Sequence, residues 1–207
     1  MEQIPGPSKE RLLFLMRLLE HSSEDAITSA RIEALSGWAS HTIRKDISFL
    51  EAASEGQTIG SSGGYDPASL AALIKKALGL ERRRKFCVVG LGRLGSAYLN
   101  VRELEDSEFE LAAGFDINVN RTEILASPVP LYPAYKMGEV ISRFGIEIAL
   151  LCVPAEAAQS SAEKLAAAGI LGILNFAPAA LSVPPVIAVK NVYLTDELRA
   201  LAIRMGH

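Results

Sequence analysis

The feature that most constrains the fold of this chain is a glycine-rich segment with strict G-x-G-x-x-G spacing. Gly90, Gly92 and Gly95 directly follow the apolar run 86–89 and open a stretch with helical periodicity. The first glycine permits a tight turn, the second lets an anionic group approach the backbone, and the third lets a helix pack closely on a strand. Because these needs arise together where a strand leads into a helix, the spacing predicts a βα unit of a parallel sheet.

An acidic residue completes this pattern. Asp116 lies 21 residues after Gly95, at the end of the next predicted strand, where its carboxylate would accept hydrogen bonds from ribose hydroxyls and repel a 2′-phosphate. The helix that begins with Arg93 and Leu94 offers free N–H groups to a pyrophosphate. The fingerprint predicts a dinucleotide site for NAD(H) in preference to NADP(H). The alternative is a Rossmann-like fold that binds another nucleotide or none.

Apolar runs alternate with helical stretches as far as the C-terminus, which predicts a mainly parallel sheet. Several of the expected strands are near-continuous apolar runs, typical of strands covered on both faces; they span 86–90, 111–116, 148–153, 170–176 and 186–189. The proline-containing stretch 128–133 is expected to be irregular, and a helix over 195–205 closes the chain. The composition changes at Gly79, so we expect two domains, 1–80 and 81–207.

The N-terminal domain has the pattern of a winged helix-turn-helix. Apolar residues recur at helical spacing; Ser8 is the expected cap of the first helix, and the other three helices are expected to begin at Ser29, Ser40 and Pro67. Gly37 supplies the turn between the second and third helices, and Ile32 and Leu35 are expected to point inward. The glycine-rich stretch 55–66 predicts a short hairpin or wing. The predicted fold class is therefore α/β, a winged helix-turn-helix followed by a Rossmann-type parallel sheet.

The third helix is the candidate recognition helix. With Ile43, Ile47 and Leu50 on its inner face, its outward residues are His41, Thr42, Arg44 and Lys45. In a helix-turn-helix these side chains reach base edges and phosphates of DNA; the alternative is a solvated helix face. The charge of the domain is unfavourable for DNA binding, because residues 1–80 contain eight Lys or Arg against ten Asp or Glu, whereas DNA affinity depends on cationic contacts to phosphate.

The sequence lacks the patterns of enzymes, metal proteins and membrane proteins. Its three histidines lie in the N-terminal domain or at the C-terminus, away from the predicted dinucleotide site, and no metal-ligand or Ser-His-Asp pattern occurs. Cys87 and Cys152 sit in apolar runs, which predicts core residues. No apolar run approaches the roughly 20 residues that cross a bilayer. We expect a cytoplasmic protein that binds its dinucleotide without catalysis.

These segments together resemble the Rex redox-sensing transcriptional repressors over nearly the whole chain. The matching motifs are Ile4-Pro5, Ile43-Arg44-Lys45-Asp46, Gly64-Tyr65-Asp66, the segment 90–95, Phe115-Asp116, Val153-Pro154-Ala155, Gln159 and the segment 173–178. The resemblance implies a homodimer with a swapped C-terminal helix, which binds operator DNA with NAD+ or without ligand and releases it when NADH binds. It also implies a lining for the cofactor and nicotinamide region made of Val153, Pro154, Asn175, Phe176, Ala177 and Pro178.

Three positions depart from the family pattern. Rex proteins carry a Lys-Arg pair in the wing, and the stretch 55–63 here contains no cation. The resemblance also implies a switch in which an arginine on the first helix, an aspartate before the C-terminal helix and a tyrosine on the glycine-rich helix alternate as partners. Arg11 fits the arginine, but Tyr193 and Val101 stand at the other two positions. A charge-assisted switch cannot operate through these side chains.

Two other functions therefore compete with a repressor. A diverged paralogue that acts as a nucleotide-binding or protein-interaction module, without operator binding, fits the cation-poor wing. The C-terminal half also looks like the CoA-binding domain of succinyl-CoA synthetases, which has a similar glycine-rich entry and a later Val-Pro turn. This last alternative ranks third, because a CoA site requires no ribose-binding carboxylate such as that of Asp116.

Overall fold

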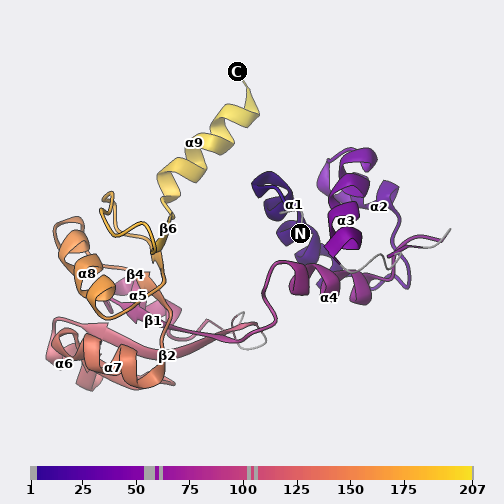
Figure 1. The fold of residues 1–207 in the computed structure, drawn as a ribbon. Coiled ribbons are helices and arrows are strands. Elements are labelled where there is room, and N and C mark those ends of the chain that lie inside the picture. The colour runs from indigo at the N-terminus through magenta and orange to yellow at the C-terminus, as the bar shows by residue number, and fades with distance from the viewer. Residues whose placement is uncertain (1–3, 54–58, 61–62, 102–103, 105–106, 207) are drawn as a thin grey trace. The chain divides into compact units, whose positions relative to one another are not determined.

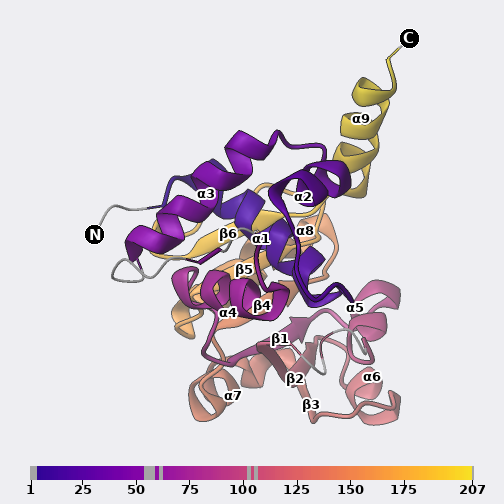
Figure 2. The same cartoon turned by 90° about the vertical axis from the view of Figure 1, so that its right-hand side faces the viewer.

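The computed structural model describes residues 4–53, 59–60, 63–101, 104 and 107–206. The chain divides into two compact units, Met1–Arg82 and Arg83–His207, and each is described by itself. Figures 1 and 2 show the helices of the first unit and the sheet of the second from two directions.

The described part of the first unit is mainly helical. Its helices are α1 (Gly6–Glu20), α2 (Ser29–Ser36), α3 (Ser40–Ala53) and α4 (Pro67–Ala77). The starts predicted for the last three helices are confirmed. The predicted cap of the first helix at Ser8 is wrong, because Pro7 is accommodated in the first turn, where no N–H partner is needed, and the helix already begins at Gly6. Gly37 ends α2 with φ of 74°, a left-handed conformation that favours glycine.

The core of this unit lies between the inner faces of the helices. Its members come mainly from α1, α3 and α4: Leu12, Leu15, Met16, Leu19, Ile43, Ile47, Leu50, Leu70 and Ile74. Ile32 of α2 is buried as predicted, but Leu35 is 46% exposed, so its inward placement is wrong. Residues three apart on a helix differ by about 60° in direction, and a helix of two turns buries only one narrow side.

The predicted wing, 55–66, lies largely outside the described residues and stays a prediction. Within the described part, Tyr65 forms an antiparallel bridge with Ile27, with N···O distances of 2.8 and 2.9 Å. Gly64 has φ of 115°, and a Cβ there would lie 2.7 Å from the carbonyl oxygen of Ile27. Glycine is therefore required where the chain returns to α4.

A bidentate ion pair joins α1 to α3. The guanidinium of Arg11 donates to Asp46 from Nε to Oδ2 at 2.6 Å and from Nη2 to Oδ1 at 2.8 Å. Arg11 also donates to the hydroxyl of Ser8 at 3.3 Å. The side chain of Asp46 is only 4% exposed and that of Arg11 is 27% exposed. This geometry fixes the position of α3 on α1 and commits Arg11 to a partner inside its own unit.

Replacing Arg11 tests this brace. Arg11→Ala should lower the free energy of unfolding of the first unit by about 2 kcal/mol, because it leaves the buried carboxylate of Asp46 without its cation. Urea unfolding followed by the fluorescence of Trp38, the one tryptophan of the chain, reports on this unit. Arg31→Ala is the control: its ion pair with Glu24 is 51% and 38% exposed, so about 0.5 kcal/mol is expected. Equal losses in the two variants would contradict the assignment.

The second unit is built on a parallel sheet of strand order β3-β2-β1-β4-β5-β6. The strands are β1 (Arg84–Val89), β2 (Phe109–Asp116), β3 (Leu131–Pro133), β4 (Ile148–Leu151), β5 (Gly172–Asn175) and β6 (Ala188–Asn191). The irregular structure expected over 128–133 is wrong in part, because Leu131–Pro133 pairs with β2 at the edge of the sheet, where a proline costs no ladder hydrogen bond. The strand expected over 186–189 lies instead over 188–191. The prediction was inaccurate because β6 is exposed along its length and has no buried apolar pattern.

Helices cover both faces of the central strands. Beside the 3₁₀ helix η2 (Ala134–Lys136), the described helices of this unit are α5 (Arg93–Tyr98), α6 (Val119–Ile124), α7 (Met137–Phe144), α8 (Ala155–Ala167) and α9 (Leu194–Met205). Cys87 and Val89 pack with α7 and α8, whereas Phe86 and Val88 pack with residues of the α5 segment. The last helix, α9, follows β6 (Figure 1) and has no buried residue. Among the described helices, none is long and apolar enough to cross a membrane.

Candidate functional site

The candidate site lies at the carboxyl edge of the sheet, between β1 and β4. The strand order reverses direction there, and open α/β sheets bind ligands in the crevice at such a switch point. The Gly90 N–H donates to the carbonyl of Phe115 at the end of β2, and the Cys152 N–H donates to the carbonyl of Val89, both at 2.8 Å. The glycine-rich turn therefore contacts the ends of both neighbouring strands.

The three glycines of the turn differ in what surrounds them. A Cβ at Gly95 would lie 1.9 Å from the carbonyl oxygen of Gly90, so α5 approaches the turn too closely for any side chain at this position. Gly90 has φ of 90°, and a Cβ there would lie 2.6 Å from the carbonyl oxygen of Cys152. At Gly92 a Cβ would meet nothing within 4 Å. The backbone at Gly92 thus faces open space, while the other two glycines are required by packing.

Asp116 connects the end of β2 to the glycine-rich turn. Its carboxylate is buried and accepts hydrogen bonds from the Leu91 N–H at 2.7 Å, the Asn118 N–H at 2.8 Å and Nη1 of Arg121 at 3.1 Å. Two of these bonds reach Oδ2 and one reaches Oδ1, so Oδ1 retains one acceptor position. The sequence motif did not single out Arg121, a residue of α6 that brings a cation to the carboxylate.

The segment after β5 lies at the same edge of the sheet. The Phe176 N–H donates to the carbonyl of Leu151 at 2.9 Å, next to Val153 and Pro154. The ring of Phe176 packs on that of Tyr98 from α5, with ring centroids 5.0 Å apart. The structure thus brings the glycine-rich turn, Asp116 and the segments 153–154 and 175–178 to one edge. Arg93 and Leu94 open α5 with exposed side chains.

Side chains from β5, from α8 and from the residue before α9 fix this segment. Asn175, fully buried, accepts from the Ala177 N–H at 3.0 Å and donates to the carbonyl of Ala179 at 2.9 Å. Gln159 of α8 exchanges two hydrogen bonds of 2.9 Å with the backbone of Ser182. The Tyr193 hydroxyl donates to the Ala179 carbonyl at 2.9 Å. The sequence did not predict this contact between Tyr193 and Ala179, because no motif includes it.

The cysteines have the properties of core residues. Cys87 is fully buried, and burial raises the pKa of its thiol above the ordinary value. Burial also raises the pKa of Cys152 to about 12. Both thiols are protonated near neutral pH and are poor nucleophiles. Among the described residues, no group of His, Cys, Asp and Glu could hold a metal ion.

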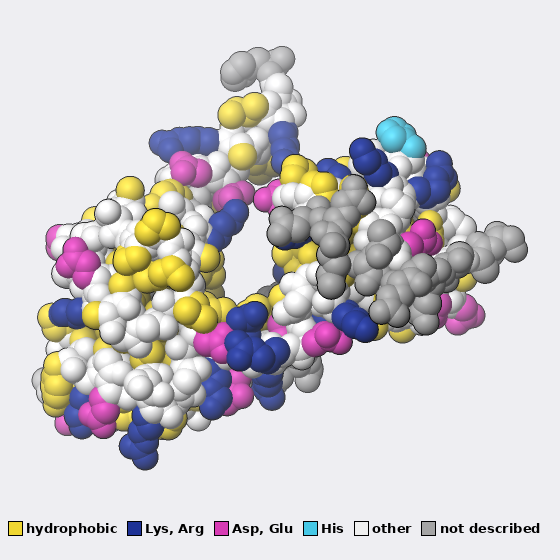
Figure 3. Space-filling view, in the orientation of Figure 1, with side chains coloured by type: hydrophobic (Ala, Val, Ile, Leu, Met, Phe, Trp, Pro, Cys, Tyr) yellow, Lys and Arg dark blue, Asp and Glu magenta, His cyan; other side chains and the backbone are white. Residues whose placement is uncertain are grey.

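The candidate nucleic-acid interface is the outer face of α3. His41, Arg44 and Lys45 are exposed and Thr42 is half-buried, so the four predicted residues share the accessible side of the helix. Nη1 of Arg44 also donates to the hydroxyl of Ser29 at 3.2 Å. In the space-filling view, Lys and Arg side chains lie next to a His on this unit (Figure 3).

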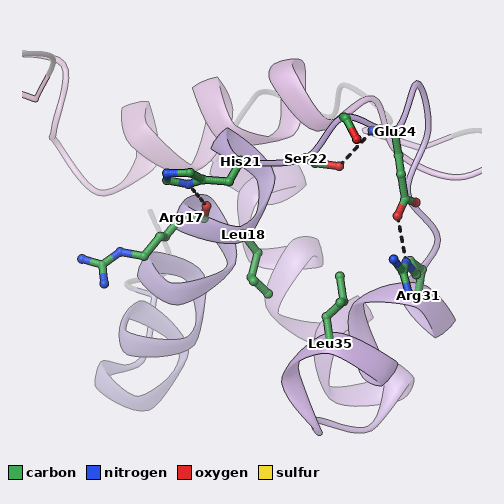
Figure 4. Close-up of a pocket in the computed structure, with 8 residues that line it drawn as sticks. Arg17, Leu18, His21, Ser22, Glu24, Arg31 and Leu35 are labelled. Carbon is green, nitrogen blue, oxygen red and sulfur yellow. Dashed lines mark hydrogen bonds and ion pairs between the residues drawn. The ribbon is translucent and has the colours of Figure 1, made fainter. Parts of the chain in front are cut away.

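A separate hollow of about 520 Å³ lies in the first unit. It is lined by Arg17, Leu18, His21, Ser22, Ser23, Glu24, Arg31 and Leu35 (Figure 4). Arg31 pairs with Glu24 at 2.8 Å, and Nδ1 of His21 lies 2.9 Å from the carbonyl oxygen of Arg17. These polar groups are engaged with one another, and none of them belongs to α3.

Comparison with known proteins decides the family. The redox-sensing transcriptional repressor Rex of Ligilactobacillus salivarius is 34% identical over 209 residues, covering 99% of this chain and 95% of that protein. The Rex of Bacillus licheniformis is 33% identical over 209 residues, covering 99% and 94%. The chain belongs to the Rex family of redox-sensing transcriptional repressors. The model of the CoA binding domain family matches residues 81–179.

Solved structures of a Rex-family repressor, RSP, have the same fold. RSP in complex with β-NAD+ and operator DNA matches with a TM-score of 0.85 and 30% identity, over 98% of this chain and 92% of that chain. RSP in complex with β-NADH matches with a TM-score of 0.85 and 29% identity, over 99% and 95%. The predicted Rex membership and fold class are confirmed. The CoA-ligase alternative is not favoured, because the Rex relatives also cover the helical unit.

Substitution at Gly95 tests the packing of this Rex protein at its glycine-rich turn. Gly95→Ala should destabilise the second unit by about 1–3 kcal/mol, because the new methyl group overlaps the carbonyl oxygen of Gly90. Differential scanning calorimetry measures the loss. Gly138→Ala, in α7, is the matched control: nothing lies within 4 Å of its Cβ position, so we expect no loss or a small gain. A neutral Gly95→Ala would contradict the close contact.

Proposed function

We propose that this protein is a transcriptional repressor that binds operator DNA through α3 and senses the NADH/NAD+ ratio through its second unit. The observation that carries the proposal is the convergence of the glycine-rich turn, Asp116 and the segments 153–154 and 175–178 at the switch point of the sheet. The likeness over nearly the full chain to RSP, solved with β-NAD+ and operator DNA and with β-NADH, supports it.

The dinucleotide would lie across the carboxyl edge of the sheet. The open space at Gly92 leaves room for a pyrophosphate against the backbone of the turn, with Arg93 and Leu94 beside it. The remaining acceptor position on Oδ1 of Asp116 would take one ribose hydroxyl. The nicotinamide would then face Val153 and Pro154 on one side and the segment 175–178 on the other.

The dinucleotide is bound without being transformed, in our proposal. The described histidines, His21 and His41, belong to the first unit. Neither histidine is therefore part of the sheet whose edge forms the crevice. Both cysteine thiols are protonated, and the hydroxyl of Tyr193 is bonded to a backbone carbonyl. A regulator that works on chromosomal DNA in this way would act in the cytoplasm.

The repressor would be a homodimer. On α9 the side chains of Leu194, Leu198, Leu201 and Met205 recur at helical spacing and are between 54% and 75% exposed. A second apolar surface that is only partly covered, a hollow of about 540 Å³, lies on the sheet and includes Phe109, Ile148 and Val189. Apolar surfaces of this kind are covered in stable assemblies. A second copy, with α9 exchanged between subunits, would cover both.

DNA binding would depend on α3. The first unit is not basic overall, so its affinity for phosphates must come from a few local cations, and Arg44 and Lys45 supply two of them. His41 and Thr42 precede them in the first turn of the helix, the part that meets base edges in helix-turn-helix proteins. A module that no longer binds an operator is not favoured, because the relatives that match the whole chain are repressors.

Replacement of Asp116 tests the nucleotide assignment. Asp116→Ala should weaken NADH binding about tenfold, because one acceptor for the ribose and the partner of the Leu91 N–H are lost together. Isothermal titration calorimetry with NADH measures the change. Glu139→Ala removes an exposed carboxylate from α7 and should leave the affinity unchanged. Unchanged affinity in Asp116→Ala would show that this residue does not take part.

A double substitution tests the DNA-binding face. Arg44→Ala with Lys45→Ala should weaken binding at least about tenfold and reduce the slope of log K against log salt concentration by about 2, because two phosphate contacts are lost. The probe is a duplex that the wild-type protein selects from a random pool, measured by fluorescence anisotropy.

The matched control removes the same charge elsewhere in the first unit. Lys9→Ala with Lys76→Ala takes two exposed cations from α1 and α4, and should reduce affinity much less. If both pairs have equal effects, DNA is attracted by the general charge of the unit and α3 is not the recognition helix.

A further inference from the structure

Tyr193 links the loop after β5 to the start of α9. It is the residue before this helix, and its backbone carbonyl accepts hydrogen bonds from the Asp196 N–H at 2.9 Å and the Glu197 N–H at 3.2 Å. Its side-chain hydroxyl donates to the carbonyl of Ala179 at 2.9 Å. One residue therefore both begins α9 and contacts the loop that follows the predicted nicotinamide segment.

The hydroxyl of Tyr193 also belongs to a partly buried hydrogen-bond network. Nδ2 of Asn175 lies 3.4 Å from this hydroxyl, 2.9 Å from the carbonyl oxygen of Ala179 and 2.9 Å from Oδ1 of Asn191. Asn175 is completely buried at the end of β5, and the Val192 N–H donates to its carbonyl at 2.9 Å. The approach to α9 is thus bonded to Asn175 through both side chain and backbone.

The same network reaches the glycine-rich helix. Phe176, the residue after Asn175, packs its ring on Tyr98 of α5 and donates its N–H to Leu151 at the end of β4. These residues belong to α5, to the segment after β5 and to the end of β4, elements that border the crevice between β1 and β4. From there to Tyr193 the path runs through the contact of the two rings, the backbone from Phe176 to Asn175 and the hydrogen bonds of Asn175, a contiguous network of the kind that can carry coupling between two sites.

We propose that Tyr193 is the positioning residue through which occupancy of the dinucleotide site sets the position of α9. This inference rests on the proposed function. A bound dinucleotide presses on the segment 175–178, the carbonyl of Ala179 moves with that segment, and the Tyr193 hydroxyl transmits the movement to the first turn of α9. The link is a hydrogen bond between uncharged groups, so it differs from an ion-pair switch.

The partners of Arg11 support this assignment. Its guanidinium is bound in bidentate fashion by Asp46 of α3, a contact within the first unit, and Tyr193 offers it no carboxylate. A hydrogen bond of a phenol to a carbonyl requires no charged partner and is little affected by salt. The connection that Tyr193 makes is the hydrogen bond to the Ala179 carbonyl, on the nucleotide side of the sheet.

Hydrogen exchange on the full-length protein tests this link. In the wild type, saturating NADH should change the exchange rates of the backbone amides over 193–199 at least about fivefold, and equally at about 0.05 M and about 0.5 M salt. In Tyr193→Phe the change should fall below about twofold, while the dissociation constant for NADH, measured by calorimetry, stays within about threefold. Tyr135→Phe, at a tyrosine 79% exposed, should behave as wild type.

The possible failures can be told apart. If the wild type does not bind NADH in the calorimeter, the proposed function is wrong and the link with it. If the wild type binds NADH but α9 does not respond, or if Tyr193→Phe retains the full response, only the link is wrong. A loss of NADH affinity in Tyr193→Phe beyond about tenfold would also overturn it, because Tyr193 would then belong to the binding site itself.

Discussion

The arrangement of the second unit depends on the contact between α5 and the turn after β1. No side chain fits at Gly95, because a Cβ would lie 1.9 Å from the carbonyl oxygen of Gly90. With the helix this close, the Leu91 N–H reaches the carboxylate of Asp116, and Gly90 packs against the carbonyl of Cys152. The ends of β1, β2 and β4 are thereby brought to one point, which is where the nucleotide site can form.

A charged contact has the corresponding role in the first unit. The pair of Arg11 and Asp46 joins α1 to the helix that carries the predicted DNA contacts, and both its hydrogen bonds are partly shielded from water. Such a bidentate contact restricts orientation as well as distance. The two units thus use different means for the same purpose: glycine packing positions a ligand-binding turn, and an ion pair positions a recognition helix.

Sequence prediction succeeded for the parts of the fold that are buried. The central strands were predicted because strands covered on both faces are apolar throughout, and the starts of α2, α3 and α4 followed from periodicity and turn residues. The errors in the strands and at Leu35 occurred where burial gives no signal. β3 and β6 lie at the two edges of the sheet, β6 is exposed throughout, and Leu35 lies on a helix too short to bury two sides.

The sequence by itself determined the glycine-rich turn, the acidic residue at the end of β2 and the family, because each depends on residue types at short, fixed spacings. Only the tertiary structure decided the partners of these residues. Leu91 meets Asp116 across 25 positions, Arg11 meets Asp46 across 35, and Asn175 meets Tyr193 across 18. Such contacts depend on which strands and helices lie side by side, and local periodicity has no information about that order.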